Sequence, residues 1–360
     1  MNAQQPQSAP ESRATRTGRS VAVIIPCYNY ANFLADAIAS VLEQTHPQVE
    51  IVVVDDGSSD NTREVAAHYS RVRYVRQDHQ GLAAARNAGI RESRSPYLVF
   101  LDADDRLLPG ALESGLASFS AHPECAFVSG GFRRIGPDGS VLGDPVIPHI
   151  SKDHYVETLK RSYISMPATV MFRREVLERV NGFDASLRFC EDFDIYLRIV
   201  RNHPVCCHGA VVAEYRMHHA NKSGNHALML KTALRVLRKQ WPYVKADARC
   251  TAAYNLGTRF WKQCYGFELL QGIRQSLRQV HPWRAIKASS ALLRFAPAFA
   301  GKRLAGSMAR RAKRLAARAA KTILPDTVVR RLAVAFLHGL ALEEIPTDAR
   351  GTAWGSRRTH

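Results

Sequence analysis

The sequence predicts an α/β protein with a mostly parallel central sheet, followed by an α-helical, basic C-terminal region. Short apolar runs rich in β-branched residues alternate with helical patterns through the first half of the chain. Two of these runs end in clusters of aspartate, and only helical patterns remain beyond about residue 226. Alternating strands and helices favour a parallel sheet covered on both faces, and such sheets bind ligands beyond the carboxyl ends of their strands.

The first two strands are the clearest elements. Val21–Ile25 and Glu50–Val54 contain continuous apolar runs, which are typical of strands buried on both faces. Between them, Ala31–Gln44 has apolar side chains at helical spacing. The remaining predicted elements are a helix to Tyr69, strand Val72–Val75, helix Leu82–Glu92, strand Tyr97–Leu101, helix Pro109–His122, strand Ala126–Ser129, hairpin Phe132–Val141, strand Pro167–Phe172, helices Glu175–Val180 and Glu191–Arg201, and strand Val211–Tyr215.

The composition limits the partners and the compartment. The chain has 360 residues, enough for one large domain and a smaller appendage, and a formal net charge of +18. This excess implies a polyanionic partner: nucleic acid, an anionic membrane surface or a phosphate-bearing substrate. No recognisable nucleic-acid-binding module accompanies the basic residues, so nucleic acid is not expected. The seven cysteines contain no Cys-x-x-Cys pair, which favours reduced thiols in the cytoplasm over a disulfide framework.

We expect four segments along the chain. Residues 1–19 form a disordered leader without a signal peptide, residues 20–225 the α/β domain, residues 226–345 the helical basic region, and residues 346–360 a disordered tail. No uncharged apolar run approaches the roughly 18 residues that span a bilayer. The basic amphipathic stretch 301–323 either lies on an anionic membrane or belongs to a bundle with a solvated face. The expected location is the cytoplasm, with peripheral attachment to the inner face of the cytoplasmic membrane.

Aspartates follow two predicted strands at what would be the same edge of the sheet. Asp102 and Asp104 project the same way in an extended segment, so one can face a ribose while the other binds a divalent cation. Asp56 either accepts a hydrogen bond from a base or ribose, or caps the following helix. Carboxylates gathered at one edge are costly without a cation or donors, which favours the functional interpretation.

Other candidate residues lie near the ends of predicted elements. After the first strand, Tyr28 either lies against a base or packs at the sheet edge. After the last strand, His218 either completes a metal site or is an ordinary surface histidine. Asp192 lies in the first turn of a predicted helix, where a carboxylate also interacts favourably with the helix dipole.

Four sequence blocks together resemble the inverting family 2 glycosyltransferases of the GT-A fold. They occur in the family's order and extend over about half of the chain: Val21–Thr62, Gly81–Ile90 (GLAAARNAGI), Leu98–Asp105 (LVFLDADD) and Asn181–Ile199 (NGFDASLRFCEDFDIYLRI). One departure is the sequence His79-Gln-Gly81, where relatives often have a Gln-Asn pair. This leaves the contacts of that loop open.

The resemblance implies a role for each matching residue. The residues that border the nucleoside would be Pro26, Tyr28 and Asp56, and Asn29 is a further candidate for binding the nucleotide sugar. Arg86 and Asn87 would lie near the donor, and Asp102 would touch the ribose. Asp104 would bind Mn²⁺ or Mg²⁺ together with the diphosphate. Independently of the resemblance, Asp102 and His218 are further candidate metal ligands. Asp192 would be the general base, with Glu191 beside it.

The expected reaction is the transfer of a hexose from a nucleoside-diphosphate sugar, with uridine as the family's commonest base, to a hydroxyl group of a glycan or lipid-linked acceptor. Such acceptors belong to polysaccharide or envelope synthesis. The charge of Glu191 and partial burial would raise the pKa of Asp192 above the ordinary value of about 3.9. Two alternatives remain. A nucleotidyltransferase would need a Gly- and Lys/Arg-rich loop after the first strand. A non-catalytic relative that only binds a sugar or nucleotide would be expected to have lost Asp102, Asp104 or Asp192.

Overall fold

The computed structural model describes residues 19–218, 225–279, 282–301 and 303. Within them, nine strands form one sheet in the order β3-β2-β1-β4-β8-β6-β9-β5, with β7 paired to β6. The strands are β1 (Val21–Cys27), β2 (Val49–Asp55), β3 (Val72–Arg76), β4 (Tyr97–Phe100), β5 (Arg106–Leu107), β6 (Phe127–Ile135), β7 (Val141–Val146), β8 (Val170–Arg173) and β9 (Cys206–Arg216).

The sheet has a parallel half and a mixed half. Strands β3, β2, β1 and β4 pair in parallel, as the sequence pattern predicts. Beyond β4, strand β8 is antiparallel to both β4 and β6, whereas β6 and β9 are parallel. The switch follows from the connections, because β6 and β8 no longer alternate with long crossover helices. The α/β fold class is confirmed, and its antiparallel pairs lie on one side of β4.

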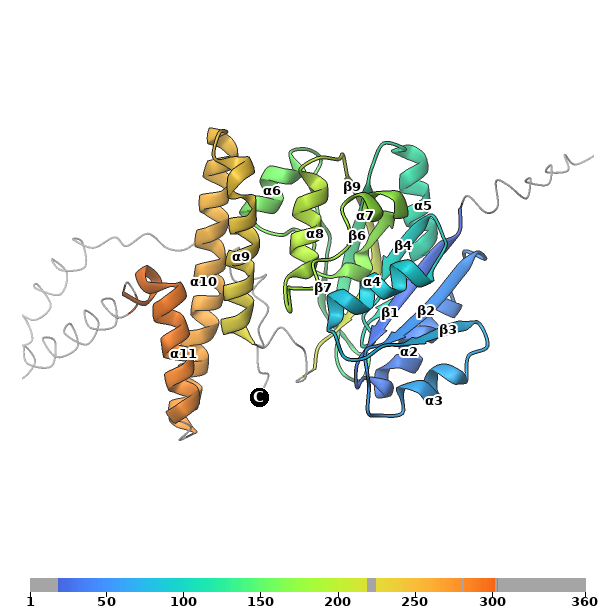
Figure 1. Ribbon diagram of the computed structural model, residues 1–360, viewed down its shortest axis with the longest axis horizontal. Helices are drawn as coiled ribbons and strands as arrows, with labels where there is room; N and C mark the ends of the chain where they lie inside the picture. The colour runs from blue at the N-terminus through green and yellow to red at the C-terminus, as the bar shows by residue number, and fades with distance from the viewer. Residues whose placement is uncertain (1–18, 219–224, 280–281, 302, 304–360) are drawn as a thin grey trace, which may run out of the picture. The chain divides into compact units, whose positions relative to one another are not determined.

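Helices cover both faces of the sheet (Figure 1). One core joins the sheet to α2 (Ala31–Leu42), α3 (Thr62–Ala67) and α5 (Ala111–Ala121). The opposite core joins it to α4 (Leu82–Glu92), α7 (Arg174–Arg179) and α8 (Glu191–Val200). Successive residues of β1 belong alternately to the two cores, which explains why this strand is apolar at every position.

Some elements differ from the sequence-based expectation. The predicted strand from Pro167 begins with a 3₁₀ turn, Pro167–Thr169, and becomes extended only at Val170. Helix α6 (His154–Lys160) and the short strand β5 were not expected. The hairpin around residues 136–139 is present, and β6 and β7 form its two strands. Short elements of this kind depend on tertiary packing more than on local pattern, so they escape prediction.

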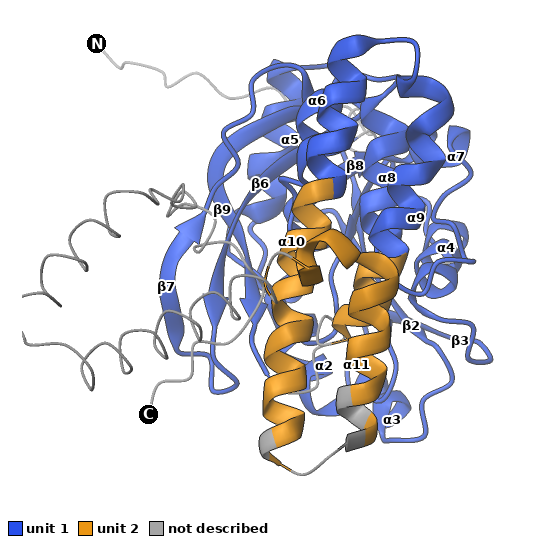
Figure 2. Cartoon of the chain, turned by 90° about the vertical axis from the view of Figure 1, so that its left-hand side faces the viewer, with its two compact units in different colours: residues 1–221, 232–258 blue, residues 222–231, 259–360 orange. Residues whose placement is uncertain are grey.

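The C-terminal part consists of helices α9 (His226–Val244), α10 (Ala248–Arg278) and α11 (Pro282–Phe295). The chain divides into two compact units, one of residues 1–221 and 232–258 and the other of residues 222–231 and 259–360 (Figure 2). Among the described helices, none has the length and hydropathy needed to cross a bilayer. The basic stretch 301–323 lies outside the described residues except for Gly301 and Arg303, and so do residues 1–18 and 346–360.

Candidate active site

The carboxyl ends of β1, β2 and β4 lie at one edge because these strands are parallel neighbours. Asp102 and Asp104 follow β4, and Asp56 follows β2. Burial, together with the negative charges of Asp104 and Asp102, raises the pKa of Tyr30 to about 12. Tyr30 immediately precedes α2, so the aspartates after β4 lie close to the end of β1 as well.

Arg86 on α4 connects two of the predicted site residues. Its guanidinium is fully buried, donates through Nη1 to Glu191 Oε1 at 2.7 Å, and donates through Nη2 to Asp102 Oδ1 at 2.8 Å. Burial opposes the charged form, but the two carboxylates stabilise it and raise the pKa of Arg86 above its usual range. One buried cation therefore joins the end of β4 to the start of α8.

The position of Arg86 depends on close packing of α4. At Gly89, one turn further along, a Cβ atom would overlap the side chain of Ile24 on β1, so only glycine permits this approach. Asn87 fixes the helix from the other side. It donates to the carbonyl of Phe183 and accepts from the amide of the same residue, both at 2.8 Å.

Asp192 lies in the first turn of α8, next to the Arg86 pair. Its carboxylate is half-buried, and its Oδ1 accepts the amide of Phe193 at 2.7 Å. Burial, followed by the charge of Glu191, raises the pKa of Asp192 to about 7, while Arg86 acts in the opposite direction. The carboxyl group is thus poised to exchange a proton near neutral pH, as a general base requires.

Asp104 is paired with His218, which follows β9. His218 Nε2 lies 2.9 Å from Asp104 Oδ2, and its ring stacks on Phe33 of α2 with centroids 4.9 Å apart. The sequence gap of 114 residues between the two is closed by the pairing of β5 with β9. Asp104 and His218 therefore place a carboxylate oxygen and an imidazole nitrogen side by side, and both are atoms of the kind that bind metal ions.

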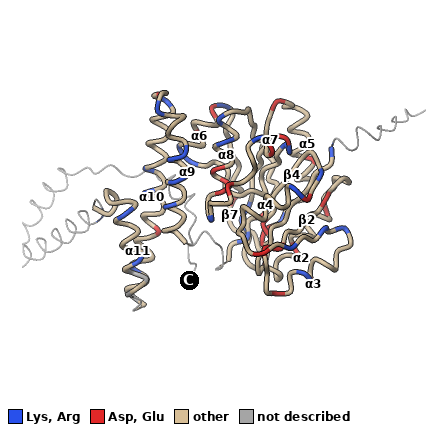
Figure 3. Tube along the Cα trace, in the orientation of Figure 1, with Lys and Arg blue, Asp and Glu red and all other residues tan. Residues whose placement is uncertain are grey.

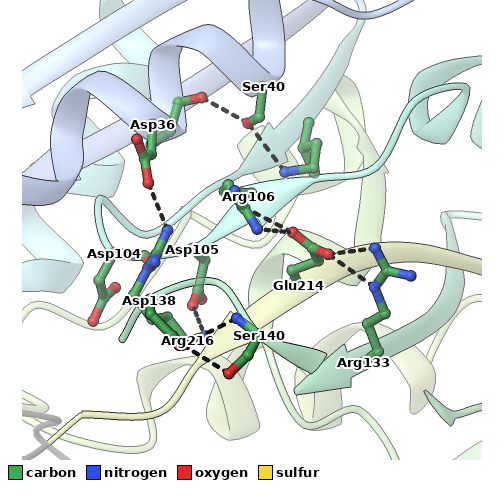
Figure 4. A network of polar contacts seen from close by, with 12 residues as sticks. Asp36, Ser40, Asp104, Asp105, Arg106, Arg133, Asp138, Ser140, Glu214 and Arg216 are labelled. Carbon is green, nitrogen blue, oxygen red and sulfur yellow. Dashed lines mark hydrogen bonds and ion pairs between the residues drawn. The ribbon is translucent and has the colours of Figure 1, made fainter. Parts of the chain in front are cut away.

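Arg216 fixes the loop that carries Asp104, as Figure 4 shows. Its Nε donates to the carbonyl of Asp104 at 3.0 Å, and its backbone amide donates to Asp105 Oδ1 at 2.9 Å. Its two terminal nitrogens reach Pro137 in the hairpin and Asp36 on α2. Arg216, the last residue of β9, thus uses its side chain for contacts within the protein.

Asp56 organises the loop before α4. Its Oδ1 accepts from Gln77 Nε2 at 2.7 Å and the Gln80 amide at 2.9 Å, and its Oδ2 accepts from the Gly81 amide at 2.8 Å and lies 2.9 Å from His79 Nδ1. Both oxygens of the buried carboxylate thus accept hydrogen bonds from other groups of the protein. A contact with a base remains a prediction.

An aromatic pair stands beside this loop. Tyr28 stacks on His79 with ring centroids 4.1 Å apart, and both side chains are accessible to solvent. Pro26 is buried within β1 opposite Val54. Asn29 adopts a left-handed backbone with φ of 55°, and its Oδ1 accepts the Ser59 amide at 2.8 Å. These residues shape the sheet edge next to Asp56.

Helix α9 contributes polar contacts to α8 that the sequence pattern does not reveal. Lys239 contacts the buried carboxylate of Asp194, and its Nζ lies 2.9 Å from Asp184 Oδ2. The carboxylate of Asp194 also accepts a hydrogen bond from Arg198 Nε at 2.7 Å, and Arg198 Nη2 donates to the carbonyl of Gly182 at 2.7 Å. The helix that carries Asp192 is therefore fixed to the preceding loop and to α9.

The arrangement brings several predicted residues together. Arg86 links Asp102 to Glu191, Asp192 lies in their electrostatic field, and His218 pairs with Asp104. No cluster of three His, Cys, Asp or Glu side chains suited to a metal was found among the described residues. A single cleft shared by Asp56, Asp104 and Asp192 remains a prediction.

Comparison with known proteins identifies the family. The family model described as glycosyl transferase family 2 matches residues 22–180. The chain is 31% identical over 213 residues to the putative teichuronic acid biosynthesis glycosyltransferase TuaG of Bacillus subtilis, a match that covers 57% of this chain and 82% of TuaG. The chain belongs to glycosyl transferase family 2. It is also 32% identical over 193 residues to the uncharacterized glycosyltransferase EpsJ of B. subtilis, covering 50% of this chain but only 56% of EpsJ.

Solved structures show the same fold at low identity. TarS of S. aureus, residues 1–349 in complex with UDP-GlcNAc, superposes with a TM-score of 0.54 at 17% identity, over 75% of this chain and 79% of that one. The mannosyltransferase PcManGT of Pyrobaculum calidifontis, in complex with GDP-Man and Mn²⁺, gives 0.52 at 18% identity, over 92% and 81%. The family 2 chain therefore has a GT-A type fold, as expected. The family match ends before α8, so it does not include Asp192, whose role remains a prediction.

Proposed function

We propose that this chain is an inverting, metal-dependent hexosyltransferase that acts on a nucleoside-diphosphate sugar. The observation that carries the proposal is the half-buried Asp192, with a pKa of about 7, beside the Arg86-bridged pair of Asp102 and Glu191. A carboxylate of this kind is a far better base towards an alcohol than an ordinary aspartate.

In the proposed reaction Asp192 removes the proton of an acceptor hydroxyl. The hydroxyl oxygen forms a bond to the anomeric carbon on the face opposite the diphosphate, and the bond from that carbon to the diphosphate oxygen breaks. The diphosphate leaves with the bonding electrons, so the configuration inverts. Arg86 keeps Glu191 and Asp102 in place and limits how far the pKa of Asp192 rises.

The donor set fits a divalent cation with few protein ligands. Asp104 and His218 lie side by side, and Asp102 is two residues away in sequence. Mg²⁺ is commonly bound through one or two carboxylates and substrate phosphates rather than by a complete protein cage. When bound, Mn²⁺ or Mg²⁺ would neutralise charge on the departing diphosphate.

The nucleoside is proposed to lie at the edge formed by Pro26, Tyr28, Asn29 and Asp56. Stacked Tyr28 and His79 offer an exposed aromatic face for a base. Such stacking accepts any base, because every base has a π-face. We propose uridine as the base, in line with UDP-GlcNAc in the TarS complex. Asn87 is proposed to support the donor site through its contacts with Phe183.

The acceptor is proposed to be a hydroxyl of a glycan or lipid-linked saccharide in polysaccharide or envelope synthesis. TuaG is named for teichuronic acid biosynthesis. A chondroitin synthase of Pasteurella multocida is 30% identical over 184 residues, which cover 50% of this chain and only 18% of that protein. The proposed location is the cytoplasm, with peripheral association at the inner face of the cytoplasmic membrane, as the net charge of +18 favours.

A donor-hydrolysis screen tests the proposal without knowledge of the acceptor. The full chain is incubated with a panel of UDP-, GDP- and other nucleotide sugars, with Mn²⁺ or with EDTA. Release of a nucleoside diphosphate that depends on Mn²⁺ is the expected result. Nucleoside-diphosphate binding in calorimetry without hydrolysis would favour a non-catalytic nucleotide-sugar-binding relative. Absence of both binding and hydrolysis would reject the proposed donor site.

A further inference from the structure

The second unit exposes an apolar surface on its helical hairpin. This hairpin consists of α10 from Arg259 onward and α11, which are separated by residues 279–281 (Figure 2). Close to this connection, Leu277 is 63% exposed and Trp283 is 75% exposed. Four large apolar residues of the hairpin are more than half exposed, and we name them the hairpin surface: Leu277, Trp283, Ile286 and Leu293.

Helix α11 has two different faces. Leu292 is buried, as is Ala296 four residues later. Trp283, Ile286 and Leu293 lie at spacings of three and seven residues, which places them on one side of the helix, and each is more than half exposed. A monomer gains nothing from a row of exposed large apolar side chains, so such a row marks an interaction surface.

The charge around the hairpin surface has one sign. Residues 259–303 contain nine Lys or Arg residues and a single acid, Glu268, whose side chain is largely buried. Lys287 and Arg294 are exposed and each follows a hairpin-surface residue directly in sequence. In Figure 3 the described parts of α10 and α11 carry Lys and Arg with little Asp or Glu.

We propose that the hairpin surface docks on an anionic lipid bilayer, which extends the peripheral membrane association proposed above. An exposed tryptophan, an apolar row and flanking cations are the features of helices that lie in a membrane interface. A second copy of the same surface would bring like charges together. Nucleic acid would use the cations but would leave the aliphatic side chains Ile286 and Leu293 without a partner.

Vesicle sedimentation of the full chain tests the surface directly. The probes are vesicles of phosphatidylcholine alone and of phosphatidylcholine mixed with phosphatidylglycerol. The expected result is binding to the anionic vesicles, weakened about tenfold by Trp283→Ser and again by Ile286→Ser. The pair Lys287→Gln and Arg294→Gln should together weaken binding about thirtyfold, since each cation near an anionic surface contributes about fivefold.

Matched controls come from the first unit. Val141 on β7 is 55% exposed, the same fraction as Ile286, so Val141→Ser removes a comparable apolar side chain elsewhere. Arg63→Gln and Arg71→Gln remove two exposed charges from that unit. These controls should bind vesicles like the wild type.

The outcomes separate the surface from the proposed activity. Metal-dependent donor hydrolysis in solution should be unchanged in the hairpin-surface variants, so its failure in the wild type would reject the reaction and leave the vesicle result standing. Equal vesicle binding by the wild type, Trp283→Ser and Ile286→Ser would overturn the proposal. Binding that polynucleotide abolishes and that depends on the cations alone would overturn it in favour of a nucleic-acid partner.

Discussion

Replacing Arg86 by methionine tests how the site controls its proposed base. The substitution keeps a long apolar side chain but leaves the carboxylates of Asp102 and Glu191 without their shared cation. Loss of one partner from a buried ion pair costs about 3–5 kcal/mol. Most of this cost should come from Glu191, whose side chain is 7% exposed, because solvent screens Asp102 at 29%. We therefore expect a loss of about 3 kcal/mol in the free energy of unfolding.

The same substitution should move the pH dependence of the reaction. Arg86 lowers the pKa of Asp192 from what burial and Glu191 alone would set, so its removal must raise that pKa above about 7. A base is active when deprotonated, and the acidic limb of the rate profile should thus move towards higher pH. If the limb moves by about one pH unit, the rate at neutral pH falls by up to about tenfold. Arg86→Lys, which retains the charge, should move the limb less.

The assays are urea unfolding and the pH profile of donor hydrolysis. Arg174→Met is the matched control, because this largely buried arginine serves the carbonyls of Ser95 and Ile90 and has no predicted catalytic partner. It should lose stability without moving the acidic limb. An Arg86→Met protein that folds, turns over and keeps the wild-type limb would refute the assigned electrostatic role of Arg86.

Three further predictions concern other parts of the site. Asp104→Ala should raise the Mn²⁺ concentration for half-maximal hydrolysis at least about tenfold; an unchanged Mn²⁺ titration would remove Asp104 from the metal site. Tyr28→Ala should weaken nucleoside-diphosphate binding in calorimetry about tenfold, as loss of one stacked base contact predicts, whereas Tyr28→Phe should bind normally; equal affinities would place the base elsewhere. Lys239→Met should lower kcat with little change in donor affinity, because it removes one of the two cations that pair with the buried Asp194 of α8 and leaves only Arg198. Arg235→Met, which loses one 3.2 Å bond to Ser186, should have little effect; parallel losses in both variants would contradict a specific role for Lys239.

The parallel half of the fold follows directly from the sequence. Strands such as Val21–Cys27 are apolar at every position, and an aspartate cluster after a strand indicates a ligand-binding edge. The mixed half does not follow, because the register of β6 against β9 joins residues about eighty apart through irregular pairing. No local pattern records such long-range contacts.

The sequence marks the candidate site residues, but not the contacts that connect them. The Asp102 and Asp104 pair, Glu191 and Asp192 stand out as acids at element ends, and His218 follows a strand. The bridge from Arg86 to Glu191 spans 105 residues, and the contact of Lys239 with Asp194 spans 45, so both depend on packing of whole helices. The sequence also singles out Asp56 as a candidate, but it does not show that Asp56 accepts hydrogen bonds from the loop before α4.

The most direct test of the account is a single comparison between the wild type and Asp192→Asn. Calorimetry should show that the variant binds the nucleoside diphosphate with Mn²⁺ as the wild type does, because the change is nearly isosteric and leaves Arg86 paired. Turnover of the donor should fall by about 10²–10⁴, the usual contribution of a general base. Wild-type turnover in Asp192→Asn would contradict the central claim that this carboxylate accepts the acceptor's proton.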